Sequence, residues 1–179
     1  MKSVVQAVLA LSIAFAHPAI ATTKPRPAQS TAPTAAHVKA VQDLLSVMQV
    51  ENVMRRVAYR SRFPTEAQRK AAFAKLDKTP PAEIHRRLAL PMALVISADT
   101  ALEMTRFYTT PYGKQVIYRK YNSGPQIVMP GAQAAVPKEE KKERKRAAYV
   151  LASKELADAE ATLEHEAFKL LQKLHSEKR

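Results

Sequence analysis

The spacing of apolar residues is the feature that most limits how this chain can fold. Over residues 38–57 and 151–174 they recur three and four positions apart, which places them along one face of a helix. The sequence also has only three glycines among its 179 residues. Because glycine costs about 1 kcal/mol in a helix whereas alanine and leucine cost little, this composition favours helices. We predict an all-α fold: a compact bundle of several short to medium helices with a long C-terminal helix.

Residues 1–21 have the three parts of a secretory signal peptide. Lys2 supplies the positive start, an apolar run follows over residues 4–16, and Ala19 and Ala21 are small residues that suit a cleavage site. The run is shorter than the roughly 20 apolar residues that span a bilayer. We therefore expect export, cleavage near Ala21 and no transmembrane segment afterwards. Because the sequence has no cysteine, the exported protein has no disulfides and depends on its core.

The rest of the chain divides by composition. Residues 22–36 are rich in Thr, Pro and Ala and have no large apolar side chain. Such a segment cannot bury enough surface to offset the entropy lost on ordering, so we predict a disordered linker there. A helical core domain is expected over residues 37–124, a loop over residues 125–137, and one long charged helix over residues 138–179.

Capping residues and prolines predict where the core helices begin. The first pattern is compatible with one helix or with two, and we favour two because the apolar stripe shifts near residues 49–52, where Asn52 suits a cap for the second. Thr79 is predicted to cap a later helix, with Pro80 at its first position, where a missing N–H costs nothing. Pro91 falls within that helix and is expected to kink or split it, because proline removes a backbone donor.

Residues 97–120 are predicted to form two short helices joined at a sharp turn. Ser97 suits an N-cap, so the first of these helices should run over residues 98–108. The helical spacing of its apolar residues predicts that Leu102 and Phe107 face the core.

The junction between these two helices, residues 106–114, is called the corner below. Thr110 followed by Pro111 is a cap and proline pair, which ends one helix and begins the next. Gly113 comes in the first turn after the junction and indicates that another backbone passes close to it. Basic, aromatic and turn residues meet here, which makes the corner the candidate binding site. Its candidate residues are Arg106, Phe107, Tyr108, Pro111, Tyr112, Gly113 and Lys114.

The corner resembles the signature of a known family. An aromatic pair at 107–108, a Thr-Pro pair at 110–111 and a Gly-Lys pair at 113–114 follow a helix capped by Ser and Asp. This order is similar to that of the exported proteobacterial family catalogued as domain of unknown function 2059, over residues 38–121. The resemblance implies an α-helical periplasmic domain and brings no reaction with it. The chain departs from the family pattern in having fewer acidic residues before the corner and a long charged C-terminal segment.

The chain is strongly basic, with a formal net charge of +13, most of it on residues 22–137. Such a charge attracts anionic lipid headgroups, lipopolysaccharide phosphates or acidic polymers, but with little specificity. Export argues against nucleic acid as a partner. The run over residues 138–146 mixes both signs, which is typical of a solvated helix face that projects into solvent. A binding arm is the second interpretation of that run.

Motifs for catalysis or cofactor binding are absent from the sequence. It has no cysteine nucleophile, no Gly-x-Ser-x-Gly and no phosphate-binding loop, and three glycines leave little room for a glycine-rich cofactor site. Glu160, Glu164 and His165 are neighbours on one helix, but a metal needs three or four ligands that converge, which this spacing does not provide. We predict neither a cofactor nor a metal.

Two functions of different class are compatible with these patterns. The first, which we favour, is a non-catalytic binding or interaction module of the bacterial envelope that binds an envelope component or a protein partner through the corner. The second is a periplasmic hydrolase or lyase that acts on an envelope substrate, with Glu83, Asp99 and Glu103 as acid and base. Self-association through the apolar stripe of residues 151–174 is compatible with the first function.

Overall fold

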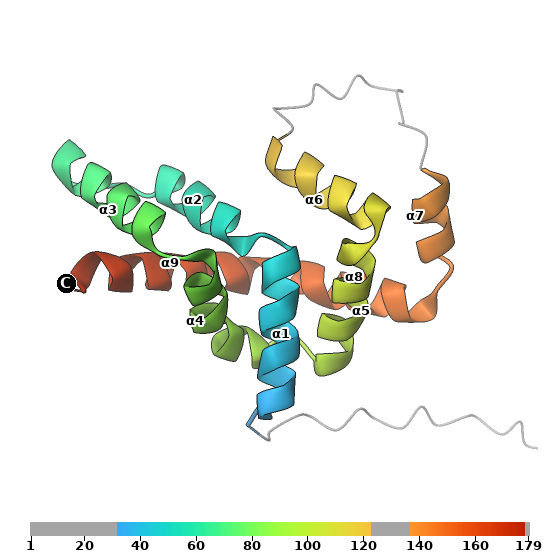
Figure 1. Ribbon diagram of the computed structural model, residues 1–179. Helices are drawn as coiled ribbons and strands as arrows, with labels where there is room; N and C mark the ends of the chain where they lie inside the picture. Colours follow the sequence, from blue (N-terminus) through green and yellow to red (C-terminus); the bar gives the residue numbers. More distant parts are fainter. Residues whose placement is uncertain (1–31, 123–136, 178–179) are drawn as a thin grey trace, which may run out of the picture. The chain divides into compact units, whose positions relative to one another are not determined.

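The computed structural model describes residues 32–122 and 137–177, and these residues form helices and no strands (Figure 1). The helices are α1 (Ala35–Val47), α2 (Val50–Arg60), α3 (Glu66–Lys78), α4 (Pro81–Ala93), α5 (Ala98–Thr109), α6 (Pro111–Asn122), α7 (Lys138–Glu143), α8 (Ala147–Asp158) and α9 (Glu160–Ser176). The all-α prediction is therefore confirmed. The predicted signal peptide, most of the linker and most of the loop over 125–137 lie outside the described residues.

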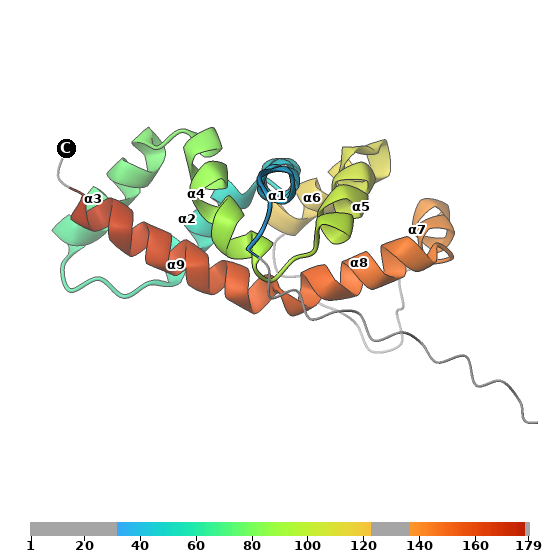
Figure 2. The same ribbon diagram turned by 90° about the horizontal axis from the view of Figure 1, so that it is seen from below.

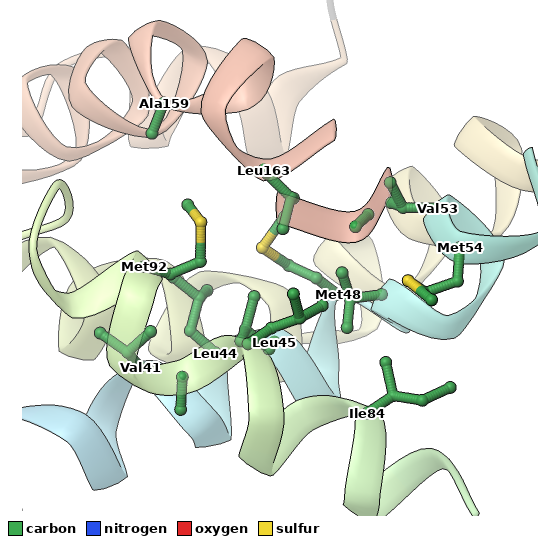
Figure 3. Close-up of a cluster of buried hydrophobic side chains, with 14 of the residues drawn as sticks. Val41, Leu44, Leu45, Met48, Val53, Met54, Ile84, Met92, Ala159 and Leu163 are labelled. Atoms are coloured by element: carbon green, nitrogen blue, oxygen red, sulfur yellow. The ribbon is translucent and has the colours of Figure 1, made fainter. Parts of the chain in front are cut away.

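The core forms where α1 meets its neighbours. Helix α1 packs on α4 and α5, while α9 lies against α2, α3 and α4, and α8 lies against α5 (Figures 1 and 2). Buried side chains from α1, α2, α4 and α9 meet in one cluster, which is shown in Figure 3. The largest fully buried side chains include Leu44, Leu45, Met54, Ile84, Leu88 and Met92. Among the described residues, no helix is both long enough and apolar enough to cross a membrane.

The predicted break between the first two helices is confirmed, but its cap is different. Gln49 takes a left-handed conformation with φ of 52° and precedes the first residue of α2. Asn52 lies inside the first turn, where its N–H donates to the carbonyl of Gln49 at 2.9 Å. Because the chain turns at Gln49, the helix begins before Asn52, and the prediction that Asn52 caps it is wrong. Helix α1 also begins earlier than expected, because the Thr34 side chain accepts from the N–H of His37.

The junction of α3 and α4 differs from the predicted one by a single residue. Thr79 ends α3 instead of capping α4, and its hydroxyl donates to the carbonyl of Lys75 at 2.8 Å. Pro81 takes the first helical position and Pro80 the cap. Two consecutive prolines allow either register, and the Pro80 carbonyl selects this one by accepting the N–H of Glu83 at 2.9 Å. Pro91 falls in the last turn of α4 and does not split it.

The prediction of one long helix over residues 138–179 is wrong, because the segment forms three helices. Arg146 has an extended backbone, with φ of −90° and ψ of 116°, and separates α7 from α8. At Ala159 the chain stays helical in conformation, and its carbonyl accepts from the N–H of Leu163 at 2.9 Å. Helices α8 and α9 therefore follow one another along the same side of the domain, as Figure 2 shows.

The apolar stripe of α9 is buried within its own chain. Ala167, Leu170 and Leu174 are at most 6% exposed, because α9 lies against α2, α3 and α4. Leu151, which the sequence pattern includes in the same stripe, is 70% exposed on α8. Self-association through this stripe would therefore require α9 to leave the body of its own chain.

Truncating the stripe tests whether its packing is internal. We expect Leu170→Ala to lower the free energy of unfolding by about 3 kcal/mol, because it removes buried methyl groups and leaves a cavity. Urea denaturation at two protein concentrations should give the same loss, since no second chain contributes. Leu151→Ala, the same change at an exposed position, should alter stability by less than about 0.5 kcal/mol. A loss that grows on dilution would contradict internal packing.

Candidate functional site

The N-terminus of α5 is fixed by two kinds of cap. The Ser97 side chain accepts from the N–H of Thr100, as the sequence predicts. In addition, the carboxylate of Glu155 on α8 accepts from the Ser97 N–H at 2.8 Å and from the Ser97 hydroxyl at 2.9 Å. A carboxylate at a helix N-terminus is stabilised by the unpaired N–H groups and the helix dipole. This contact therefore sets the position of α8 against α5.

Thr110 and Gly113 hold the corner together. The Thr110 hydroxyl donates to the carbonyl of Phe107 at 2.7 Å and accepts from the N–H of Gly113 at 3.0 Å. A side chain at Gly113 would place its Cβ 2.1 Å from the Phe107 carbonyl oxygen and 2.7 Å from the Tyr108 Cα. The predicted close approach of two backbones is therefore confirmed, and it joins the end of α5 to the start of α6.

A single methyl group should be enough to disrupt this contact. We expect Gly113→Ala to lower the free energy of unfolding by about 2 kcal/mol or more, because backbone rather than a flexible side chain must move away. Thermal and urea denaturation would measure the loss. Gln115→Ala, at an exposed position of the same helix, is the control and should change stability by less than about 0.5 kcal/mol. Equal stability of Gly113→Ala and the wild type would show that the corner can open without cost.

The aromatic side chains of the corner point towards the interior. Phe107 is buried, and its ring centroid lies 5.2 Å from that of Tyr108 and 6.1 Å from that of Tyr112. Tyr149 on α8 completes the group, with its centroid 4.9 Å from that of Phe107. Leu102, which was also expected to face the core, is 61% exposed. Helix α5 meets α1, α6 and α8, and Leu102 lies on the remaining side.

The basic side chains of the corner lie on its outer surface. Arg106 pairs with Glu103 at 2.8 Å and with Glu143 of α7 at 2.6 Å. Lys114 is exposed, as is Pro111, and in the described part of the chain no ion pair or hydrogen bond of the Lys114 side chain occurs. The structure therefore separates the seven candidate residues: the aromatic ones face inward, and the cations face solvent.

The inward-facing rings line a cavity of about 250 Å³ between α5, α6, α8 and the start of α9. Its inner wall is apolar and includes Met48, Met92, Met104 and Leu163. Figure 3 shows Met48, Met92 and Leu163 converging from three separate segments of the chain. Methionine side chains are flexible and polarisable, so such a wall adapts to apolar guests of different shape.

Helix α7 covers one side of this cavity. The Tyr112 hydroxyl donates to the Glu140 carboxylate at 2.8 Å, which keeps the pKa of Glu140 below its ordinary value. The Arg146 guanidinium bonds Glu103 at 2.7 Å and Glu143 at 2.9 Å. The expectation that the charged run over residues 138–146 projects into solvent is therefore wrong for Glu140 and Glu143, because Tyr112 and Arg106 of the corner are their partners, whereas Glu139 is exposed as expected.

Polar groups gather at one end of the cavity. Lys120 pairs with Glu160 at 3.0 Å, and both residues line the cavity. The hydroxyls of Tyr108 and Tyr149 have no hydrogen-bond partner among residues 32–122 and 137–177. Burial, with smaller contributions from Tyr149, Tyr121 and Glu160, raises the pKa of Tyr108 to about 12. Tyr108 therefore keeps its proton at neutral pH and presents a free donor at the cavity wall.

This raised pKa predicts how stability changes in alkaline solution. The folded protein holds the Tyr108 proton more tightly than the unfolded chain. The contribution of this proton to the free energy of unfolding is therefore complete below pH 10 and is lost as the pH rises towards about 12. Between pH 10 and about 12 the free energy of unfolding should therefore fall further in the wild type than in Tyr108→Phe, by up to about 2 kcal/mol. Urea denaturation at a series of alkaline pH values would measure the difference. Parallel curves for the two proteins would show that Tyr108 is not shielded from water.

The carboxylates of the hydrolase or lyase hypothesis do not form an acid and base pair. Hydrogen bonds from Arg86 and Arg87 lower the pKa of Glu83 to about 2, so it cannot act as an acid at neutral pH. Glu103 is bonded by Arg106 and Arg146, and Asp99 is exposed at the start of α5. Neither Glu83 nor Asp99 nor Glu103 lines the cavity beneath the corner.

Glu160 and Glu164, which the sequence places next to His165 on one helix, both pair with basic side chains. Glu160 pairs with Lys120, and Glu164 pairs with Arg56 at 3.1 Å. These carboxylates therefore serve as partners for cations of the core domain. Over residues 32–122 and 137–177, no group of three or more His, Cys, Asp or Glu side chains could hold a metal ion.

Comparisons with known proteins identify no relative of this chain. No family model, no curated protein and no solved structure matches the chain. The resemblance to the exported family with domain of unknown function 2059 therefore stays a prediction that rests on the corner sequence.

Sequence reasoning missed the side chains that complete the cavity. Met48 and Met92 read as ordinary core residues of their helices, and Tyr149 follows the charged run. The only signal for Tyr149 was an aromatic side chain in an otherwise aliphatic stretch of α8. Its position beside Phe107 depends on the docking of α8, which local patterns do not specify.

Proposed function

We propose that this protein is a non-catalytic binding module of the bacterial envelope, and that it holds a small, largely apolar molecule in the cavity beneath the corner. One observation carries the proposal: an apolar cavity of about 250 Å³ is lined by aromatic and methionine side chains and has an unpartnered hydroxyl in its wall. The cavity is partly open to solvent, so a small molecule can enter it without unfolding of the surrounding helices.

The volume limits the size of the molecule. An engineered apolar cavity of roughly 150 Å³ is enough to bind benzene, whereas pockets for drug-sized ligands start at roughly 300 Å³. The cavity lies between these values, so it suits one substituted ring or a short acyl chain. This refines the favoured function, because the ligand would sit behind the aromatic residues of the corner rather than on its outer surface.

The location in the envelope is supported by the sequence alone. The pattern of residues 1–21 and the resemblance to an exported family both point to the periplasm. The strongly basic surface would keep such a protein near anionic lipids and polymers, where small apolar molecules partition. The hydrolase or lyase alternative has no comparable support, because its three carboxylates are exposed or paired with arginines.

Methyl signals of methionine test the proposal directly. The purified chain would be labelled at its methionine methyl groups and titrated with ethylbenzene while NMR spectra are recorded. We expect the signals of Met48, Met92 and Met104 to shift, since these side chains line the cavity. Met54 is buried elsewhere in the core and should not respond, which makes it an internal control.

Obstructing the cavity should weaken the response. Ala157 lines the exposed rim of the cavity, so Ala157→Phe would obstruct its opening and weaken ethylbenzene binding at least about tenfold. Ala161→Phe, the same change outside the cavity wall, is the matched control and should bind as the wild type does. Unchanged methionine signals at saturating ethylbenzene would overturn the proposal.

A further inference from the structure

We infer that the cavity selects an uncharged ligand with an aromatic body and one carbonyl or hydroxyl oxygen, and that the Tyr108 hydroxyl donates a hydrogen bond to that oxygen. The inference rests on the proposed function, since it names the class of ligand for the same cavity. Four properties of the cavity lead to it: an unsatisfied donor, the balance of charge, the ring cluster and the sulfur atoms beside it.

The first property is the state of the Tyr108 hydroxyl. Tyr108 is largely buried and lines the cavity, and within the described residues no group accepts its proton. The hydroxyl therefore stays accessible in the cavity wall, where a ligand oxygen can accept its hydrogen bond in place of water. The neighbouring Tyr121 shows the usual alternative, because its hydroxyl donates to the Met48 carbonyl at 3.0 Å.

The second property is the absence of a free charge in the cavity wall. Lys120 and Glu160 neutralise each other at 3.0 Å, and Glu160 lies near the Tyr108 hydroxyl and contributes to its raised pKa. Glu140 already accepts from Tyr112 and pairs with Arg144. A carboxylate ligand beside Tyr108 would face Glu160, and a cationic ligand would find both carboxylates engaged. An uncharged ligand avoids both costs.

The third and fourth properties concern the body of the ligand. Phe107, Tyr108 and Tyr149 all line the cavity, and the Phe107 ring centroid lies 5.2 Å from that of Tyr108 and 4.9 Å from that of Tyr149, both in tilted arrangements. Aromatic rings pack favourably against one another in such arrangements. Met48 and Met92 also line the cavity, and their sulfur atoms favour aromatic guests.

Three probes of similar size separate the parts of this inference: ethylbenzene, acetophenone and benzoate. Ethylbenzene has no acceptor, acetophenone carries a carbonyl oxygen, and benzoate carries a negative charge. Dissociation constants would be measured by the methionine methyl titration on the full chain and on Tyr108→Phe, which keeps the ring and removes the donor. Tyr118→Phe is the matched control, because Tyr118 is 66% exposed and does not line the cavity.

We expect Tyr108→Phe to weaken acetophenone binding about threefold to tenfold, the usual value of one hydrogen bond, and to leave ethylbenzene binding unchanged. Tyr118→Phe should change neither. Benzoate should bind more weakly than acetophenone to the wild type, because it would place a buried charge near Glu160.

Failure of this inference can be distinguished from failure of the proposed function. If neither ethylbenzene nor acetophenone moves the cavity methionine signals, both are wrong. If both bind and Tyr108→Phe affects them equally, the cavity binds apolar molecules but Tyr108 does not recognise an acceptor, and the inference alone falls. Benzoate binding as tight as that of acetophenone would overturn the selection for uncharged ligands. Urea denaturation of each variant at neutral pH would confirm that it is folded.

Discussion

The burial of the α9 stripe is the contact on which the rest of the structure depends. Without it, α2, α3 and α4 would expose the apolar faces that α9 covers, and the acidic side chains of the C-terminal segment would leave their partners. Arg56 meets Glu164 at 3.1 Å, and Arg87 meets Glu177 at 2.6 Å. These pairs are partly accessible to solvent, and ion pairs that water reaches contribute little stability. The apolar stripe therefore supplies most of the free energy that holds α9 against α2, α3 and α4, and the ion pairs determine which residues face each other.

The cavity is a consequence of how the part of the C-terminal segment before that stripe is attached. Helix α8 precedes α9 on the same side and is held to α5 by Glu155, which caps Ser97. Helix α7 is held to the corner by a separate set of contacts, from Tyr112 to Glu140 and from Arg146 to Glu103. These polar contacts fix the backbones at both ends of α8. Between them the side chains do not fill the space, so the cavity is bounded by rigid attachments and lined by adaptable side chains.

Sequence patterns predicted the parts of this structure that depend on nearby residues. The helical class, the break at Gln49, the Ser97 cap and the close approach at Gly113 each follow from local backbone requirements. The sequence could not show where α7 and α8 dock, because their partners are distant in the chain: Arg146 bonds a residue 43 positions away. The prediction that Leu102 faces the core is wrong for the same reason. Periodicity identifies an apolar residue, whereas the neighbouring helices decide which side is covered.

The corner shows how one motif can serve both the fold and a site. Thr110 and Gly113 are explained by the backbone contact alone, and Phe107 by burial. Tyr108 is not explained in this way, because its hydroxyl has no hydrogen-bond partner among the described residues and phenylalanine would pack in the same space. Lys114 contacts no described partner and is exposed to solvent. The backbone contacts of the corner therefore account for its shape, and they do not involve the Tyr108 hydroxyl.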